Sequence, residues 1–189
     1  MDCVKTQNAV FFYGQREPTF GFLSNFHPCE FTDAEGHRFY SSEQYFMKRK
    51  QEMFDFDNDK LAVAILKAKS PPVAKKLGRQ VRHYDDQVWG QHRYEVMLEG
   101  LKLKFLSDEE LTAKLLATGD KKLYEASRRD AIWGIGLSVA NVAKMFRESK
   151  SFQRTGDVDV ETQRECFGKN LLGNALMETR AWLQPLEGR

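Results

Sequence analysis

The sequence predicts a mainly helical fold with a small strand and hairpin element. Strand patterns are concentrated in the first forty residues, whereas most of the chain after them carries helix patterns. A length of 189 residues, with 41% hydrophobic and 30% charged side chains, suits one globular core. We therefore expect a single domain over residues 1–189.

Short apolar runs near the N-terminus predict strands, and a capped helix follows them. The expected strands are 10–13, 30–32 and 37–40, the last two joined by a turn at 33–36 as a hairpin. The hydroxyl of Ser41 or Ser42 can cap a helix that runs to about Phe54. Glu43 falls in its first turn, where an acid suits the helix dipole.

The rest of the chain is predicted to be helical apart from one strand. The expected helices are 60–68, 71–78, 85–106, 108–117 and 170–183, and the expected strand is 122–126. The longest helix has apolar residues at a period of 3.6, so it should lie at the centre of the core. Residues 145–165 are polar and charged without a clear period, which predicts an inserted loop that is mobile or acts as a lid.

Charge and composition limit the function classes. The formal net charge of +2 is too small for a general nucleic-acid binder, so any nucleic-acid contact should be local. The sequence shows no run of about 18 apolar residues and no basic leader, so we expect an intracellular protein of the cytoplasm or nucleus. Its three cysteines and four histidines form no ligand motif, so we expect no metal and no cofactor.

Glu43 and Lys50 place an acid and a base on one face of the first predicted helix. Seven residues make roughly two turns of α-helix, so both side chains emerge on the same side. They form a catalytic pair if a pocket lies above that face. Otherwise Glu43 is a helix-start acid, and Lys50 is a surface lysine late in its helix.

The loop after the predicted strand at 122–126 combines an acid, an indole and two glycines. Asp130, Trp133, Gly134 and Gly136 stand where glycines allow the backbone to approach a ligand closely. Trp133 is either a ligand platform or a core residue. The same two alternatives apply to Trp89, the indole near the start of the helix expected at 85–106.

A basic stretch lies between Lys67 and Arg82, with six basic residues and no acid. Lys75, Lys76, Arg79 and Arg82 fall at helical or near-helical spacing. The stretch is either a phosphate-binding patch or a solvated helix face.

Five short motifs occur in a fixed order along the chain. They are Leu23-Ser24-Asn25-Phe26, the run from Tyr40 to Phe46 that ends at Lys50, Trp89-Gly90, the Asp130-x-x-Trp133-Gly134-x-Gly136 loop, and the segment from Gly168 to Arg180. Together they resemble the NADAR superfamily, also called YbiA-like. The resemblance covers about residues 10–183 and implies a compact, mainly helical α+β fold.

The resemblance implies an N-glycosidase that acts on ribose-linked amines. Members remove ADP-ribose from the guanine base of nucleic acid, or cleave phosphoribosyl-amine intermediates of riboflavin synthesis. We expect the first activity, with ADP-ribosylated guanine in DNA or RNA, or an ADP-ribose-like small molecule, as the partner. The alternatives are the riboflavin-intermediate glycosidase and a non-catalytic module that binds ADP-ribose or NAD.

The family resemblance and the chemistry of the reaction together predict the site residues. The expected catalytic residues are Glu43, Lys50 and Asp130. The expected substrate-binding residues are Ser24, Asn25, Phe26, Trp89, Trp133, Gly134, Gly136 and Asn170. Breaking the bond between ribose C1 and nitrogen develops positive charge at C1, which a carboxylate stabilises while an acid helps the amine leave. A lysine offers a second route, through a Schiff base with the opened ribose.

Two features depart from the family pattern. The link 138–167 is longer than expected, which makes it a candidate for substrate choice. Gln44 stands where many relatives have histidine beside the glutamate, so a histidine acid at that position is excluded.

Overall fold

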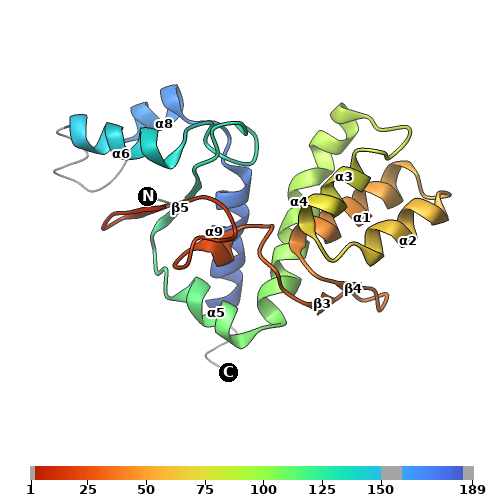
Figure 1. The fold of residues 1–189 in the computed structure, drawn as a ribbon. Coiled ribbons are helices and arrows are strands. Elements are labelled where there is room, and N and C mark those ends of the chain that lie inside the picture. The colour runs from red at the N-terminus through yellow and green to blue at the C-terminus, as the bar shows by residue number, and fades with distance from the viewer. Residues whose placement is uncertain (1–2, 150–158, 185–189) are drawn as a thin grey trace. The chain divides into compact units, whose positions relative to one another are not determined.

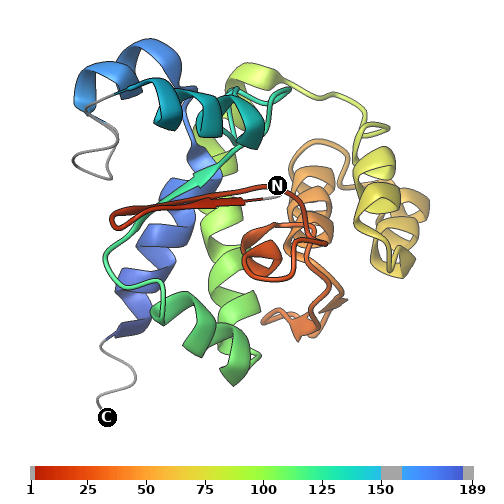
Figure 2. The same ribbon diagram turned by 60° about the vertical axis from the view of Figure 1, so that its left-hand side comes forward.

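A computed structural model describes residues 3–149 and 159–184 (Figures 1 and 2). Within this part of the chain the fold is α+β and mainly helical, as the sequence predicts. The chain forms two compact units, residues 1–24 with 113–189 and residues 25–112, which are described in turn. That residues 1–189 form a single domain stays a prediction. Among the described helices, none combines the length and apolar character that crossing a bilayer requires.

A three-stranded sheet forms the centre of the first unit. Its strands are β1 (Cys3–Lys5), β2 (Ala9–Phe12) and β5 (Lys122–Glu125). β2 lies in the middle, antiparallel to β1 and parallel to β5. All four residues of β2 are buried, which explains its purely apolar sequence. The strands expected at 10–13 and 122–126 are therefore confirmed with small shifts, whereas β1 was not predicted.

Helices cover this sheet on both sides. Figure 2 shows α6 (Val139–Glu148) and α9 (Leu171–Leu183) on opposite sides of it. The ring of Phe11 stacks on Tyr124 at a centroid distance of 4.8 Å, and Phe146 of α6 meets Phe11 edge-on. This aromatic group fixes α6 over β2 and β5. The unit also contains the 3-10 turn η1 (Gly21–Leu23) and α8 (Val160–Cys166).

The second unit is a helical group with one hairpin. Its elements are β3 (Phe31–Thr32), β4 (Arg38–Phe39), α1 (Ser42–Phe54), α2 (Asp59–Lys67), α3 (Pro71–Gly78) and α4 (Asp86–Leu106). β3 and β4 pair antiparallel, which confirms the predicted hairpin. α1 packs against α2, α3 and α4, so α1, rather than the longer α4, is the central helix of this unit.

Gln44 explains how the hairpin and α2 are joined to α1. Its amide donates to the backbone oxygens of Ile65 and Leu66, at 2.8 and 2.9 Å, and its side-chain oxygen accepts from the Tyr40 amide at 2.7 Å. The buried glutamine thereby satisfies backbone groups at the end of α2. The residue that departs from the family pattern has a structural role.

The predicted loop at 145–165 is wrong in part. α6 continues to Glu148, and α8 occupies 160–166, while 150–158 lie outside the described residues. Val139 and Val142 of α6 are buried, and Met145 and Phe146 pack against the same cluster. Their helical spacing places one apolar face on the sheet. α5 (Glu109–Leu116) agrees with the helix expected at 108–117.

Candidate active site

Glu43 is a buried carboxylate held at the start of α1. The Ser41 hydroxyl accepts a hydrogen bond from the Gln44 amide at 3.1 Å, which caps the helix and fixes Glu43 in its first turn. Asn25 then contacts Glu43 twice: its side-chain amide donates to Oε2 at 2.5 Å, and its backbone oxygen accepts from the Glu43 amide at 3.0 Å. Glu43 is 3% exposed. Its carboxylate is therefore fixed in position, as a group that acts on a reacting centre must be.

Lys50 lies two turns further along α1 and is half-buried. Its ammonium donates to the backbone oxygen of Gly78 at 3.1 Å and lies 3.9 Å from the ring centroid of Tyr84. Burial lowers the pKa of Lys50, and the positive charge of Arg79 acts in the same direction, whereas the negative charges of Asp86 and Glu43 raise it. A lysine with a lowered pKa has more of the neutral amine that attacks a carbonyl carbon.

The approach of α3 to α1 positions this lysine. A Cβ atom at Gly78 would fall 2.0 Å from the sulfur of Met47, so only glycine allows the two helices to pack at this distance. That contact brings the Gly78 carbonyl oxygen within reach of Lys50. Tyr84 completes the surroundings: its hydroxyl donates to Asp86 at 2.6 Å, and burial together with this bond raises its pKa to about 12.

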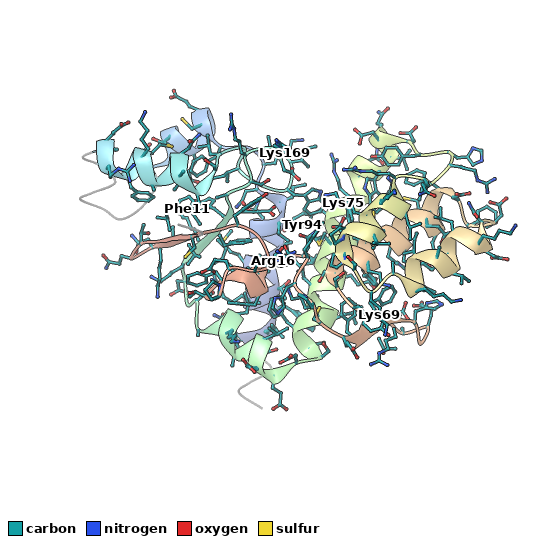
Figure 3. The ribbon with its side chains drawn as sticks, viewed as in Figure 1. Phe11, Arg16, Lys69, Lys75, Tyr94 and Lys169 are labelled. Atoms are coloured by element: carbon teal, nitrogen blue, oxygen red, sulfur yellow. The ribbon has the colours of Figure 1, made fainter. Side chains whose placement is uncertain are left out.

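The basic stretch divides into two groups with different roles. Arg82 is engaged by carboxylates, with its Nε 2.7 Å from Asp55 Oδ1 and its guanidinium 3.0 Å from Asp57. Lys75, labelled in Figure 3, instead points its ammonium toward the ring of Phe26, at 5.3 Å. Phe26 directly follows Asn25, the residue that holds Glu43. Lys75 therefore lies near the residue pair that holds Glu43, and the charge of Arg79 acts on Lys50.

Trp89 occupies a core position in the second unit. It is 4% exposed, and its ring lies 4.9 Å from Phe46 and 6.1 Å from Phe54 between centroids. This packing gives the indole a place in the core, and its substrate-binding role stays a prediction.

The predicted site residues after β5 lie in one loop that hydrogen bonds hold in place. Asp130 Oδ1 accepts from the amides of Ile132 and Trp133, at 2.9 and 2.8 Å, and its backbone oxygen accepts from Gly136 at 3.1 Å. Asp130 therefore shapes the loop by an Asx-type turn. Gly134 is buried where a Cβ would fall 2.7 Å from the Glu125 oxygen. These contacts give the loop a fixed conformation. The catalytic role of Asp130 and the substrate-binding roles of Trp133, Gly134 and Gly136 stay predictions.

Asn170 ties this loop and α9 to the sheet. Its side chain donates to the Leu123 oxygen at 2.9 Å and accepts from the Glu125 amide at 3.0 Å, and its backbone amide donates to the Gly134 oxygen at 3.2 Å. It adopts a left-handed conformation, φ 51°, which asparagine tolerates. Ser24, also of the first unit, is buried, and its amide donates to the Gly21 oxygen at 3.1 Å. The substrate-binding roles assigned to both residues stay predictions.

One group of side chains in the described chain has the spacing of metal ligands. Asp33, Glu35 and His37 hold their ligand atoms within 4.8 Å of one another. Asp33 accepts from the His37 amide at 2.7 Å, and its other oxygen lies 3.1 Å from the His37 ring nitrogen. These bonds close the β3–β4 hairpin turn and account for the cluster without an ion. The expected lack of a metal and a cofactor stays a prediction.

Comparison with known proteins identifies the family. The sequence profile of the NADAR domain matches residues 11–184. The chain belongs to the NADAR family. An N-glycosidase of Acanthamoeba polyphaga mimivirus is 31% identical to this NADAR protein over 187 residues, which are 94% of this chain and 97% of the viral one. The N-glycosidase YbiA of Escherichia coli is 32% identical over 130 residues, 69% of this chain and 78% of YbiA.

A solved structure and a further relative extend the comparison. The NMR structure of YbiA superposes on this NADAR chain with a TM-score of 0.70 at 28% identity, covering 100% of this chain and 92% of YbiA. A riboflavin biosynthesis protein of Vibrio vulnificus is 36% identical over 130 residues, 69% of this chain but only 34% of that protein. These relationships support an N-glycosidase, a hydrolase of bonds between a sugar and nitrogen.

Three features of the site were missed by the sequence interpretation. The Asn25 contact with Glu43, the Tyr84 ring beside Lys50 and the glycine contact at Gly78 all join residues that are distant in sequence. The local signal for Asn25 was its motif, which indicated substrate binding rather than support of a carboxylate. Nothing local marks Gly78 as the acceptor for Lys50.

Proposed function

We propose that this chain is an N-glycosidase that removes ADP-ribose from guanine bases of nucleic acid, with Glu43 and Lys50 as its catalytic residues. The observation that carries the proposal is the fixed, buried carboxylate of Glu43 on the same helix as a lysine of lowered pKa. Two turns of helix separate their backbones by about 10 Å. Both long side chains can therefore reach one ribose.

The chemistry follows from the two groups. Opening of the ribose ring leaves C1 doubly bonded to the guanine amino nitrogen. The neutral amine of Lys50 adds to C1, and the guanine amine leaves with a proton, which Glu43 transfers between the two nitrogens. Water then replaces lysine at C1, and the ribose closes again. The net change is addition of one water, which gives free ADP-ribose and restores the unmodified guanine within the nucleic acid.

Charge near this helix supports a diphosphate substrate. Lys75 lies beside Phe26, and Arg79 acts electrostatically on Lys50. Two cations suit the two phosphates of ADP-ribose, and the Phe26 ring offers a flat apolar surface next to Asn25. Arg82, which is bound to Asp55 and Asp57, is assigned no part in phosphate binding.

The decisive experiment is a cleavage assay on an ADP-ribosylated guanine oligonucleotide, with release of ADP-ribose as the readout. Wild-type protein should release it, and Glu43→Gln should be slower by at least about 10²-fold, since the variant keeps the shape but loses the charge. Glu52→Gln is the matched control, because Glu52 stands on the same helix and pairs with Lys48 and Arg49. Equal rates for wild type and a folded Glu43→Gln protein would remove Glu43 from the mechanism.

A second candidate is the N-glycosidase that cleaves phosphoribosyl-aminouracil, an intermediate of riboflavin synthesis. It is favoured by the name of the Vibrio vulnificus relative, which has 36% identity to this chain. The same proteins should be assayed on this substrate in parallel. Release of the aminouracil without release of ADP-ribose would replace the first proposal by the second. Binding of ADP-ribose without either cleavage would indicate a binding module.

A further inference from the structure

Two surface cavities of the first unit meet at Tyr13. The first, of about 360 Å³, is lined by Tyr13, Ala126, Arg128, Arg129 and the start of α6 at 138–140. The second, of about 320 Å³, is lined by residues 13–17. Both volumes fall in the range of small-molecule sites, about 300–1,000 Å³.

The topology of the sheet explains why these residues gather. β2 and β5 are parallel, so both strands end at the same edge, and their ladder continues with the bond from the Ala126 amide to the Phe12 oxygen at 2.8 Å. Tyr13 is the residue after β2. Arg128 and Arg129 form the turn that follows β5. Side chains at the carboxyl ends of neighbouring parallel strands are commonly placed to bind ligands.

Two arginines at this edge form no ion pair within the described residues. Arg128 and Arg129 are exposed, and within the described residues neither has an ion-pair partner. The carboxylates of Asp130 and Glu17 keep their charge, but their oxygens accept backbone amides, those of Ile132 and Trp133 and those of Thr19 and Phe20, and form no ion pair with these arginines. Two adjacent guanidinium groups that open into a cavity favour a phosphate, which they can bind by paired hydrogen bonds.

Tyr13 adds a flat surface between the two cavities. Its side chain is 53% exposed although the rest of β2 is buried. Arg16, labelled in Figure 3, lines the second cavity together with Tyr13. An exposed aromatic ring in cavities that also contain arginines can bind a base by stacking and its phosphate by charge.

We propose that the paired cavities around Tyr13 bind a nucleotide, with its base on the Tyr13 ring and its phosphate on Arg128 and Arg129. The nucleotide is either free or one unit of a single strand. This site belongs to the first unit and involves none of the residues proposed to cleave the glycoside.

Binding to unmodified ligands tests the site without cleavage chemistry. A fluorescein-labelled oligothymidylate and, separately, adenosine monophosphate are titrated into the full chain. Arg128→Ala/Arg129→Ala should weaken binding by at least about 10-fold. Tyr13→Ala should weaken it by about 5- to 150-fold, and Tyr13→Phe should keep it, since phenylalanine still stacks. For the oligonucleotide, the double arginine variant should also lower the magnitude of the slope of log affinity against log salt by about 0.7, as expected for the loss of one phosphate contact on a single strand.

Lys60→Ala/Lys144→Ala is the control, since it removes two charges from residues that line neither cavity. Weakening by the arginine and tyrosine variants with either ligand supports the site, and the ligand that binds more tightly identifies the source of the nucleotide. If the control weakens binding as much as the arginine variant does, or if neither ligand binds, the proposal is overturned. Either result leaves the cleavage assay of Glu43 to be judged separately.

Discussion

Asn25 holds Glu43 at two points, through a 2.5 Å hydrogen bond from its side-chain amide to the carboxylate and a 3.0 Å bond from the Glu43 amide to its backbone oxygen. The second bond survives any substitution of the Asn25 side chain, whereas the first does not. The position of the helix start and the orientation of the carboxylate can therefore be separated by mutation.

Asn25→Ala should lower kcat by about 10²-fold while it changes KM little. The helix start stays in place, but the carboxylate loses the donor that orients it, and a small misplacement of a reacting group costs about this much. Steady-state kinetics on the cleaved substrate measure both constants. Asn174→Ala, at an exposed asparagine that donates to the Lys169 oxygen, should behave as wild type. An Asn25→Ala enzyme with unchanged kcat would show that orientation by Asn25 is dispensable.

Lys50→Arg should be as inactive as Lys50→Ala, because guanidinium keeps the charge but does not form an imine readily. Borohydride added during turnover should trap an adduct on Lys50 that mass spectrometry locates, and Lys76→Arg, at an exposed lysine of α3, should leave the adduct in place. Because burial lowers the pKa of Lys50, the rate should rise with pH and level off below the ordinary lysine pKa. An active Lys50→Arg enzyme without an adduct would favour direct attack by water.

Trp89→Ala should destabilise the protein by about 3–5 kcal/mol, since it removes a buried indole packed on Phe46 and Phe54. Trp89→Phe should cost less, because an aromatic ring still fills part of the space. Denaturant unfolding followed by circular dichroism gives both values. Unchanged stability in Trp89→Ala, together with weaker ADP-ribose binding, would restore the ligand-platform interpretation of this indole.

The buried carboxylate of Asp55 makes the free energy of unfolding depend on pH in the acid range. Hydrogen bonds from Arg82 and Asn58 hold the pKa of Asp55 at about 2, below the value of about 3.9 in an unfolded chain. Its contribution is therefore complete above about pH 4 and is lost as the pH falls toward about 2. The free energy of unfolding of wild type should decrease over this range, and Asp55→Asn should show a shallower decrease. Asp57 is the exposed partner of Arg82, so Asp57→Asn should keep the steep decrease in the free energy of unfolding.

Local rules predicted the elements whose determinants are close in sequence. The Ser41 cap, the hairpin at 31–39 and the parallel strand β5 follow from hydroxyls, turn residues and apolar runs, so their positions agree with the structure to within one or two residues. β1 escaped prediction because three residues with only partial burial give little pattern. α6 was partly taken for a loop, since its charged outer face hid the apolar spacing of Val139 and Val142.

The candidate site was harder to predict because its residues are defined by distant partners. Motifs named Glu43, Lys50 and Asn170, but the motif alone could not tell that Asn170 binds backbone groups of β5. Asp130 illustrates the same limit: a loop acid after a strand suggests catalysis, which stays a prediction, and the structure adds that its side-chain oxygen holds a turn. This role in holding the turn becomes visible only in the folded structure.

Gly78 makes the basicity of Lys50 a property of helix packing. Any side chain at position 78 would collide with Met47 and push α3 away from α1, which would withdraw the carbonyl oxygen that holds the ammonium. Water would enter the space, and the amine would return toward the titration behaviour of an ordinary surface lysine. An unbiased search for inactive variants should therefore return position 78 together with positions 43 and 50, even though glycine has no functional group to lose.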